Sequence, residues 1–217
     1  MTNKIIGIQG DKLDKIIISS DTSIFLAHEA QKLGYKIFYY TPSNLSIIKN
    51  KTYANGVFVK FNYERKKFYK IYKKQKIDVE NLKFILIRQD PPFNSEYLIT
   101  TLILDGLKKV KVINNPTAIR NVSEKLYSKH FIKYMPNTLF SNNIEDIKKF
   151  YKQNKSMIMK PINGYGGNQI HLIKNKFNKK LITNFLNKNG HSMFQKFLKN
   201  ISKGDKRDFI INGKVCG

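Results

Sequence analysis

Residues 157–173 read MIMKPINGYGGNQIHLI, and this stretch decides how the second half of the 217-residue chain folds. Apolar runs at 157–159 and 170–173 lie on both sides of a loop that contains Lys160, a proline and three glycines. Short apolar runs bounded by turn residues predict strands, so the loop joins one strand to another. Because no helix follows the glycines, the segment is not a P-loop and lacks a helix dipole that could attract an anion.

Two roles remain open for this loop. Glycine clusters between strands usually only turn the chain, and spacing alone favours a plain hairpin. The alternative is a phosphate site, because glycines take positive φ angles and let a ligand approach exposed backbone N–H groups without a Cβ in the way. Lys160, at the end of the first strand, would add a positive charge beside the loop.

The rest of the second half also contains short strands, mixed with short helices. From Asn121 onward the sequence predicts short helices at Ser123–Lys129 and Ile144–Gln153, together with strands at Thr138–Phe140, Ser156–Lys160, Gln169–Ile173 and Ser192–Phe197. The strands flank short polar or glycine-rich turns, which favours antiparallel pairing. Residues 121–217 are therefore expected to form an α+β domain.

The first 120 residues alternate between strands and helices instead. Strands are expected at Lys4–Ile8, Lys36–Tyr40, Tyr53–Phe61, Lys83–Arg88 and Val110–Ile113, and helices at Ile24–Leu33, Tyr63–Gln75 and Ser95–Lys108. Such alternation implies βαβ crossovers and a mostly parallel sheet, so residues 1–120 form an open α/β domain. Gly7 and Gly10 follow the first strand without the third glycine of a dinucleotide fingerprint, and we interpret them as turn glycines.

Composition restricts the classes of function. The chain is 41% hydrophobic, enough for a buried core, and its formal net charge is +25. Four arginines, Arg65, Arg88, Arg120 and Arg207, leave 36 lysines among the 40 basic residues. Base readout relies on arginine, whereas these lysines are spread over the whole chain. We interpret the charge as a solvated surface of a chain with A/T-rich codon usage, with no specific nucleic-acid partner.

Cellular location follows from cysteine and hydropathy. Cys216 is the only cysteine, so an internal disulfide is impossible, which fits a reducing compartment. No apolar stretch approaches the roughly 20 residues needed to span a bilayer, and no secretory signal is recognisable. The sequence predicts a cytoplasmic protein without a membrane partner, and leaves a homo-oligomer open.

Four motifs in the same order and at similar spacing resemble prokaryotic glutathione synthetase. They are RQDPPFNSEYLITTLILD at 88–105, NNPTAIRNVSEKLYS at 114–128, MIMKPINGYGG at 157–167 and QKFLKNISKGDKR at 195–207, and IIISSDTSIFLAHEAQKLGY at 16–35 also resembles that family. The resemblance implies a Rossmann-like N-terminal substrate domain followed by an ATP-grasp domain. It also implies ligation of γ-glutamylcysteine and glycine with ATP and Mg²⁺ as cofactors.

The resemblance assigns a nucleotide site to the second domain. Lys125 and Lys160 match the family lysines that reach the phosphates of ATP, where ammonium groups offset polyphosphate charge. Without the family, Lys125 reads as a solvated helix lysine. The loop that closes over the triphosphate corresponds to Asn163, Gly164, Tyr165, Gly166 and Gly167. The segment that lines the adenine corresponds to Gln195, Lys196, Phe197 and Leu198, with the backbone of Lys196 and Leu198 as the hydrogen-bonding part.

Further residues are assigned to the sugar and the substrates. Asp205 matches a ribose contact and Arg207 matches the arginine that meets the peptide or the developing acyl phosphate, with a local ion pair on a loop as the alternative for both. Arg88 and Asp90 match the RxDPPF motif, and ligands of open α/β sheets bind beyond the carboxyl ends of strands. A proline-fixed turn is the alternative there, and Asp21 is either a substrate residue or only a helix N-cap.

The implied reaction needs no protein nucleophile. The cysteinyl carboxylate would attack the γ-phosphate of ATP, and glycine would then displace phosphate from the acyl phosphate. No metal-binding cluster follows Asp208, and the final hairpin stops four residues into its returning strand, so we expect an incomplete ATP-grasp domain and no ligase turnover by the 217-residue chain. Alternatives are another ATP-grasp carboxylate–amine ligase and a basic nucleotide- or nucleic-acid-binding protein without catalysis.

Overall fold

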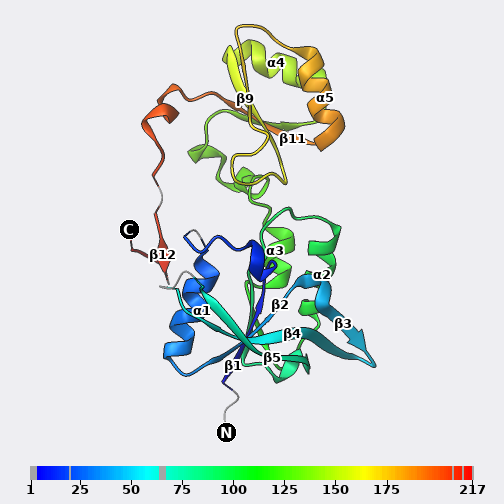
Figure 1. The fold of residues 1–217 in the computed structure, drawn as a ribbon. Helices are drawn as coiled ribbons and strands as arrows, with labels where there is room; N and C mark the ends of the chain where they lie inside the picture. Colours follow the sequence, from blue (N-terminus) through cyan, green and yellow to red (C-terminus); the bar gives the residue numbers. More distant parts are fainter. Residues whose placement is uncertain (1–3, 20, 64–66, 207, 212, 217) are drawn as a thin grey trace. The chain divides into compact units, whose positions relative to one another are not determined.

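A computed structural model describes residues 4–19, 21–63, 67–206, 208–211 and 213–216. Contacts between residues divide the chain into two units, Met1–Ser123 and Glu124–Gly217 (Figure 1). Each unit has its own buried core, and the two are described separately below. Among the helices of the described residues, none is long and apolar enough to cross a membrane.

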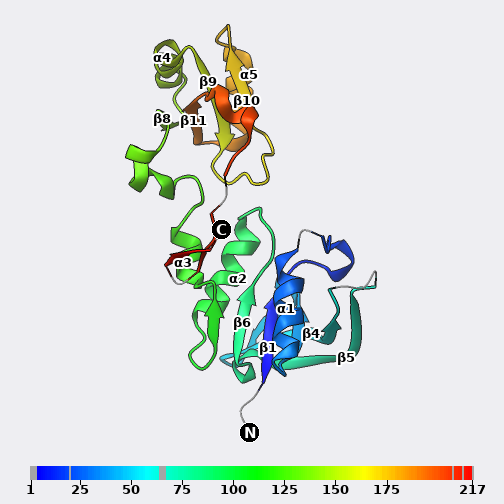
Figure 2. The ribbon, with the colours of Figure 1, turned by 90° about the vertical axis from the view of Figure 1, so that its left-hand side faces the viewer.

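Unit 1 is built on a seven-stranded sheet that combines parallel and antiparallel pairs. The strands β2, β1, β6 and β7 are parallel neighbours, whereas β3, β4 and β5 join through antiparallel pairs. Figure 2 shows β1 and β6 side by side. The strands are β1 (Ile5–Gln9), β2 (Lys36–Tyr40), β3 (Leu45–Ile48), β4 (Lys51–Phe61), β5 (Tyr69–Asp78), β6 (Phe84–Ile87) and β7 (Lys111–Ile113).

Helices cover both faces of this sheet. On one face α1 (Thr22–Lys32) buries Ile24 and Ala27 against β1, β2 and β4. On the other face α2 (Ser95–Asp105) contributes Leu104 to a second core, and α3 (Pro116–Asn121) contacts α2. Short 3₁₀ turns complete the unit: η1 (Leu13–Lys15), η2 (Pro42–Asn44) and η3 (Val79–Asn81). The expected α/β layering is therefore present, but the prediction of a mostly parallel sheet is wrong: three strand pairs are parallel and three are antiparallel, because β4 pairs antiparallel with β2, β3 and β5.

The caps of the two long helices follow from side chains that accept backbone N–H groups. Asp21 caps α1, because its carboxylate accepts the N–H groups of Ser23 at 2.6 Å and Ile24 at 3.0 Å. The N-cap role, one of the two alternatives for Asp21, is therefore confirmed. Asn94 caps α2 through the N–H of Tyr97 at 3.0 Å, and α2 begins at Ser95, where the predicted helix begins.

The helix predicted over Tyr63–Gln75 is wrong. Residues 69–78 form β5, which pairs antiparallel with β4 from Tyr53 opposite Asp78 to Phe61 opposite Tyr69. Lysine favours helices in isolation, but here a long backbone ladder to β4 overrides that preference. Residues 70–76 are exposed, so this segment does not bury the apolar stripe by which a surface helix packs on a core. The lysines also discourage another chain from pairing with this edge strand.

The two glycines after the first strand are also not turn residues. Gly7 lies inside β1, where a Cβ would approach Leu82 Cδ1 at 2.7 Å, so its role is close packing between strand and core. Gly10 follows β1 directly and donates its N–H to the Tyr40 carbonyl at 3.1 Å. A Cβ at Gly10 would collide with the Tyr39 hydroxyl. Glycine is needed at both positions because there is no space for a Cβ, and not because the chain turns there.

Unit 2 is a four-stranded antiparallel sheet in the order β10-β9-β11-β8 with helices on one face. Met157, Met159 and Phe194 are buried against Ile147 of α4 and Ile182 of α5. The elements are η4 (Tyr127–Tyr134), β8 (Thr138–Ser141), α4 (Ile144–Asn154), β9 (Ser156–Pro161), β10 (His171–Lys174), α5 (Lys179–Asn189), β11 (Ser192–Lys196), η5 (Lys199–Lys203), β12 (Ile210–Ile211) and β13 (Lys214–Val215).

The four predicted strands and the antiparallel pairing of unit 2 are confirmed, but its helices are only partly predicted. The helix expected at Ser123–Lys129 is instead the 3₁₀ segment η4, which begins four residues later. The sequence analysis missed α5, whose lysine-rich exposed face hides the buried triplet Ile182, Phe185 and Leu186. The predicted final hairpin is present as β12 and β13, with Arg207 and Asn212 outside the described residues.

A single methyl group at Gly56 should test the packing of β2 against β4. A Cβ there would lie 2.5 Å from Phe38 Cζ and 2.6 Å from the Tyr39 carbonyl oxygen, which cannot move without displacing β2. We expect Gly56→Ala to lower the free energy of unfolding by about 1–3 kcal/mol, measured by urea denaturation. The matched control is Gly106→Ala, whose Cβ would meet nothing closer than 3.7 Å. Equal stability of the two variants would contradict this packing.

Candidate functional site

The strand β9 carries Lys160 on the face of its sheet that α4 and α5 leave uncovered. Met157 and Met159 point into the helical core, so the alternation of a strand places Ile158 and Lys160 on the opposite face. Residues directly opposite across the antiparallel pairs share that face, and we call this set the lysine face: Thr138, Phe140, Ile158, Lys160, Leu172, Met193 and Gln195. Apolar and polar groups are thus combined on one surface.

Lys160 is held by a hydrogen bond and destabilised by its surroundings. Its Nζ donates to Gln195 Oε1 at 3.0 Å. Partial burial is the main cause that lowers the pKa of Lys160 from its ordinary value, and the positive charge of Lys125 adds to this, while Glu124 opposes it. The ammonium form is therefore more costly here than on the surface, which an anionic ligand would reverse.

Lys125 approaches the glycine loop from a different segment. Its Nζ donates to the Gly164 carbonyl and lies 3.5 Å from Glu124 Oε1. The side chain of Lys125 is only 13% exposed, whereas that of Glu124 is 73% exposed. Lys125 is therefore not a solvated helix lysine. The structure brings Lys125, Lys160 and the loop at 163–167 together, although they are far apart in the sequence.

The glycine loop has the backbone freedom that its sequence indicates. Gly166 and Gly167 take φ angles of 57° and 73°, in the left-handed region that favours glycine. The Gly164 N–H donates to the Pro161 carbonyl at 3.3 Å, and a Cβ at Gly164 would collide with the Pro161 ring. Asn163 and residues 165–170 are exposed, with Tyr165 40% exposed. This loop can present backbone groups to a ligand.

The segment at residues 195–198, which includes the end of β11, meets only part of its expected role. Gln195 is 7% exposed and its amide contacts Lys160 and Thr138, so its side chain supports a lysine. The N–H of Lys196 donates to the Asn137 carbonyl at 2.9 Å, and that of Phe197 to the Ser156 carbonyl at 3.3 Å. A ligand at Lys196 can therefore use its carbonyl but not its N–H group. Leu198 is 51% exposed.

The polar loop that follows gives less information. Asp205 is exposed, and the ion pair next to it joins Lys206 Nζ to Asp208 Oδ1 at 3.3 Å. The predicted catalytic residue Arg207 lies outside the described residues. Among the residues that the structure describes, no group of three or more His, Cys, Asp or Glu side chains could hold a metal ion.

In unit 1 the RxDPPF motif forms a charged cluster beyond the carboxyl ends of β1 and β6. Arg88 Nε donates to Ser23 Oγ at 2.9 Å and its Nη2 to Thr22 Oγ1 at 3.1 Å, on the first turn of α1. The Asp90 N–H donates to Asp11 Oδ2 at 2.8 Å. The sequence analysis missed Asp11, although it follows the end of β1 as Asp90 follows the end of β6.

The carboxylates of this cluster repel one another. Partial burial, followed by the charges of Asp11 and Asp21, raises the pKa of Asp90, and Arg88 opposes the shift. Burial and the same three carboxylates raise the pKa of the Tyr39 hydroxyl. An excess of negative charge that is partly shielded from water can accept a cationic group such as an ammonium.

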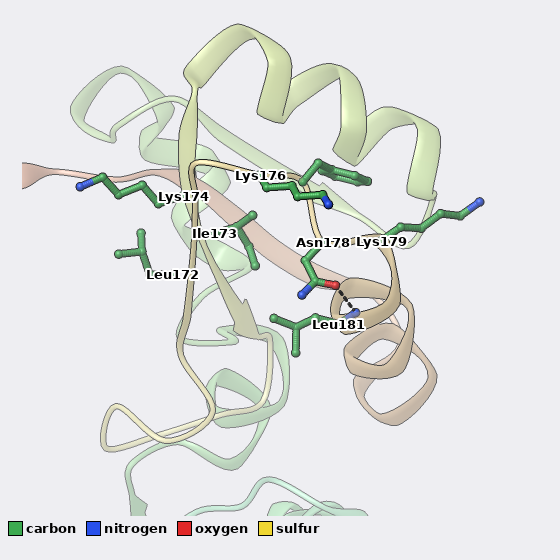
Figure 3. A pocket seen from close by; sticks show the side chains of 8 residues that line it. Leu172, Ile173, Lys174, Lys176, Asn178, Lys179 and Leu181 are labelled. Carbon is green, nitrogen blue, oxygen red and sulfur yellow. Dashed lines mark hydrogen bonds between the residues drawn. The ribbon is translucent and has the colours of Figure 1, made fainter.

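Unit 2 also contains a pocket of about 500 Å³ beside β10 and the start of α5 (Figure 3). It is lined by Leu172, Ile173, Lys174, Lys176, Phe177, Asn178, Lys179 and Leu181. Lys174 and Lys179 extend away from it in opposite directions, and the Asn178 side chain accepts the Leu181 N–H at 3.0 Å (Figure 3). Its lining contains neither Lys125 and Lys160 nor any residue of the glycine loop, so we do not place the nucleotide there.

Removing the charge of Lys125 should raise the pKa of Lys160, because like charges disfavour each other's ionised form. The variant Lys125→Met tests this by a carbon NMR titration of the lysine ε-carbons, with Lys160→Met used to assign the resonance. Lys152→Met, which removes an exposed lysine on α4, is the control and should leave the pKa of Lys160 unchanged. An unchanged value in Lys125→Met would show that the two ammonium groups do not interact.

Neutralising Asp90 should stabilise the unliganded protein. The raised pKa means that the fold disfavours the ionised carboxyl, so stability is lost as the pH rises through this group. We expect Asp90→Asn to raise the free energy of unfolding at pH 7 by about 0.5 kcal/mol, a value reduced by solvent screening. The gain should vanish at acidic pH, where both variants are neutral. Asp14→Asn, an exposed control, should show no such dependence on pH.

Comparison with known proteins agrees with this division into two units. Residues 5–120 match the N-terminal domain of prokaryotic glutathione synthetase, and residues 124–217 match its ATP-grasp domain. Glutathione synthetase from Mesorhizobium japonicum is 33% identical over 216 residues, which cover 98% of this chain and 69% of the relative. The enzyme from Wigglesworthia glossinidia brevipalpis is 36% identical over 213 residues, which cover 96% and 67%. The chain thus spans about two thirds of the length of these relatives.

The fold also resembles solved structures of ligases. D-alanyl-alanine synthetase A from Vibrio cholerae superposes with a TM-score of 0.56 at 16% identity, covering all of this chain and 65% of that one. At this identity the likeness concerns the fold alone. It confirms the predicted class, an α/β N-terminal domain followed by part of an ATP-grasp domain.

Proposed function

Because the chain belongs to the prokaryotic glutathione synthetase family of ATP-dependent ligases, we propose that Lys125, Lys160 and the loop at 163–167 bind the triphosphate of ATP. The ligation that this binding serves joins γ-glutamylcysteine to glycine. The observation that carries the proposal is the meeting of two lysines from separate segments at a glycine loop, with Lys125 bonded to Gly164 and acting on the pKa of Lys160. The two ammonium groups repel each other, and the negative charge of a polyphosphate would offset that repulsion.

The chemistry requires charge neutralisation more than proton transfer. A carboxylate oxygen of γ-glutamylcysteine attacks the γ-phosphorus, the bond from that phosphorus to the β,γ-bridging oxygen breaks, and ADP leaves. The amine of glycine then attacks the acyl carbon, loses a proton and expels phosphate. Lys125 and Lys160 offset charge on the transferred phosphoryl group, and their fixed positions avoid reorganisation during the reaction.

Family members use ATP and Mg²⁺, and Mg²⁺ supplies positive charge at the phosphates when it is bound. The described residues do not fit it, because they contain no group of three or more His, Cys, Asp or Glu side chains suited to a metal ion. We therefore assign no step and no ligand of this chain to the metal.

For the remaining parts of the nucleotide, the candidate residues are at the end of β11 and in the loop that follows it. We propose that the adenine contacts the Lys196 carbonyl and the Leu198 N–H, because the N–H groups of Lys196 and Phe197 are already used within the sheet. Ile158 and Phe140 on the lysine face offer apolar surface for the ring. Asp205 as a ribose contact and Arg207 as a catalytic cation stay proposals from the family resemblance.

We propose that the cluster in unit 1 binds a charged end of the peptide substrate. Arg88 can pair with a carboxylate, and Asp90 with Asp11 can accept an ammonium, the two charged groups of an amino-acid end. Asp21 is occupied as the cap of α1, so it contributes through its charge. Repulsion among these carboxylates favours a cationic ligand.

Nucleotide binding that depends on the phosphates tests this function. We expect ATP to protect the protein against thermal unfolding more strongly than AMP, because AMP lacks the phosphates that the lysines meet. In Lys160→Met the affinity for ATP should fall roughly ten- to hundredfold, the value of a charged hydrogen bond, with little change for AMP. Lys174→Met, an exposed lysine on β10, is the matched control. Equal protection by ATP and AMP in the unmodified protein would contradict the proposal.

A second arm of this experiment tests the substrate. With ATP present, γ-glutamylcysteine should raise the unfolding temperature further, and D-alanine, the amino acid suggested by the name of one structural relative, should not. The reverse outcome would assign the chain to a different substrate pair.

A further inference from the structure

Three hydrogen bonds on the lysine face connect Lys160 to a backbone carbonyl two strands away. Lys160 Nζ donates to Gln195 Oε1 at 3.0 Å, Gln195 Nε2 donates to Thr138 Oγ1 at 3.0 Å, and Thr138 Oγ1 donates to the Pro136 carbonyl at 2.6 Å. The three side chains come from β9, β11 and β8, which are neighbours in the sheet. Thr138 and Gln195 are directly opposite each other, so the pair is fixed by the register.

The direction of each bond in this chain is determined. An ammonium has only donors, so Gln195 must present its oxygen to Lys160. The Thr138 hydroxyl has one proton, and the Pro136 carbonyl, which can only accept, takes it. Thr138 can therefore only accept from Gln195, which requires the amide nitrogen on that side. The oxygen and nitrogen of a glutamine amide have nearly the same shape, so partners rather than packing decide their orientation.

Because Gln195 is buried, turning its amide away from its partners would cost free energy. Gln195 is 7% exposed, and buried polar groups without a partner destabilise the state that contains them. Without the Thr138 hydroxyl, the amide nitrogen of Gln195 would be left without an acceptor, or the amide would turn and point its own N–H groups at the ammonium. The first outcome removes the bond that fixes the orientation of the amide, and the second removes the acceptor of the Lys160 ammonium.

We propose that Thr138 is a positioning residue for nucleotide binding, which orients the Gln195 amide and through it fixes the Lys160 ammonium. The inference rests on the proposed ATP site and adds a residue that makes no contact with the nucleotide in this scheme. Neither the glycine loop nor the lysines themselves indicate it, because Thr138 lies 57 residues from Gln195 in the sequence.

The first experiment compares Thr138→Val, which removes the hydroxyl with little change in shape, with Thr138→Ser, which keeps it. Calorimetry should show ATP binding about five- to tenfold weaker in Thr138→Val, AMP binding within twofold of the unmodified protein, and recovery in Thr138→Ser. Thr183→Val, at an exposed threonine of α5, is the matched control and should change neither affinity. A purely structural role would instead reduce ATP and AMP binding equally.

The second readout does not need a nucleotide. In Thr138→Val the pKa of Lys160, followed by carbon NMR, should fall below its value in the unmodified protein, because the ammonium loses an oriented acceptor. Thr138→Ser should keep the original value. If ATP is bound no better than AMP by the unmodified protein, the proposed function fails, but this titration still decides whether Thr138 acts on Lys160.

A double substitution isolates orientation from packing. Both oxygens of a carboxylate accept hydrogen bonds, so the effect of Thr138→Val on the pKa of Lys160 should disappear in the Gln195→Glu background. An equal effect in both backgrounds, or no effect of Thr138→Val on the pKa of Lys160 and on the ratio of ATP to AMP affinity, would overturn the proposal.

Discussion

The proposed nucleotide site in unit 2 depends on holding the ammonium groups of Lys125 and Lys160 near each other against their repulsion. Partial burial and the charge of Lys125 lower the pKa of Lys160, so the charged form of Lys160 is disfavoured. Oxygen acceptors compensate in part: the Gly164 carbonyl for Lys125, and the Gln195 amide for Lys160. The sheet register places Gln195 beside Lys160, the glycine loop supplies the carbonyl that accepts from Lys125, and Thr138 accepts from the Gln195 amide.

The cluster in unit 1 shows the same principle with the opposite sign. Asp11, Asp21 and Asp90 raise the pKa of neighbouring groups, and Arg88 offsets only part of their charge. Perturbed titrating groups concentrate at sites that bind charged ligands, since a ligand of opposite charge relieves the repulsion. The total charge of +25 obscures this, because its many surface lysines lie outside both clusters. Local arrangement, not net charge, carries the chemical information.

Sequence patterns predicted the parts of the site that depend on local chemistry. The strands at the two ends of 157–173 are apolar runs separated by glycines. Asp21 is an acidic residue immediately before a helix. Neighbouring residues in the sequence determine both features. The strand β5 was not predicted, because its pairing with β4 outweighs the helix preference of its lysines. The link from Gln195 to Thr138 was not predicted either, because it depends on which strands are neighbours and on their register. The lysine face as a whole follows from topology.

Hydrogen bonds to protein oxygens do not use all the N–H donors of Lys125 and Lys160. An ammonium has three donors: Lys160 uses one on Gln195, and Lys125 uses one on Gly164 and a second, longer one on Glu124. The donors that are left can meet phosphate oxygens without breaking the bonds that orient the side chains. For Lys125 this has a further consequence, because its acceptor is the carbonyl of Gly164 in the loop itself. One ammonium can therefore bridge the loop and a phosphate, and the loop needs no charged residue of its own to follow the triphosphate.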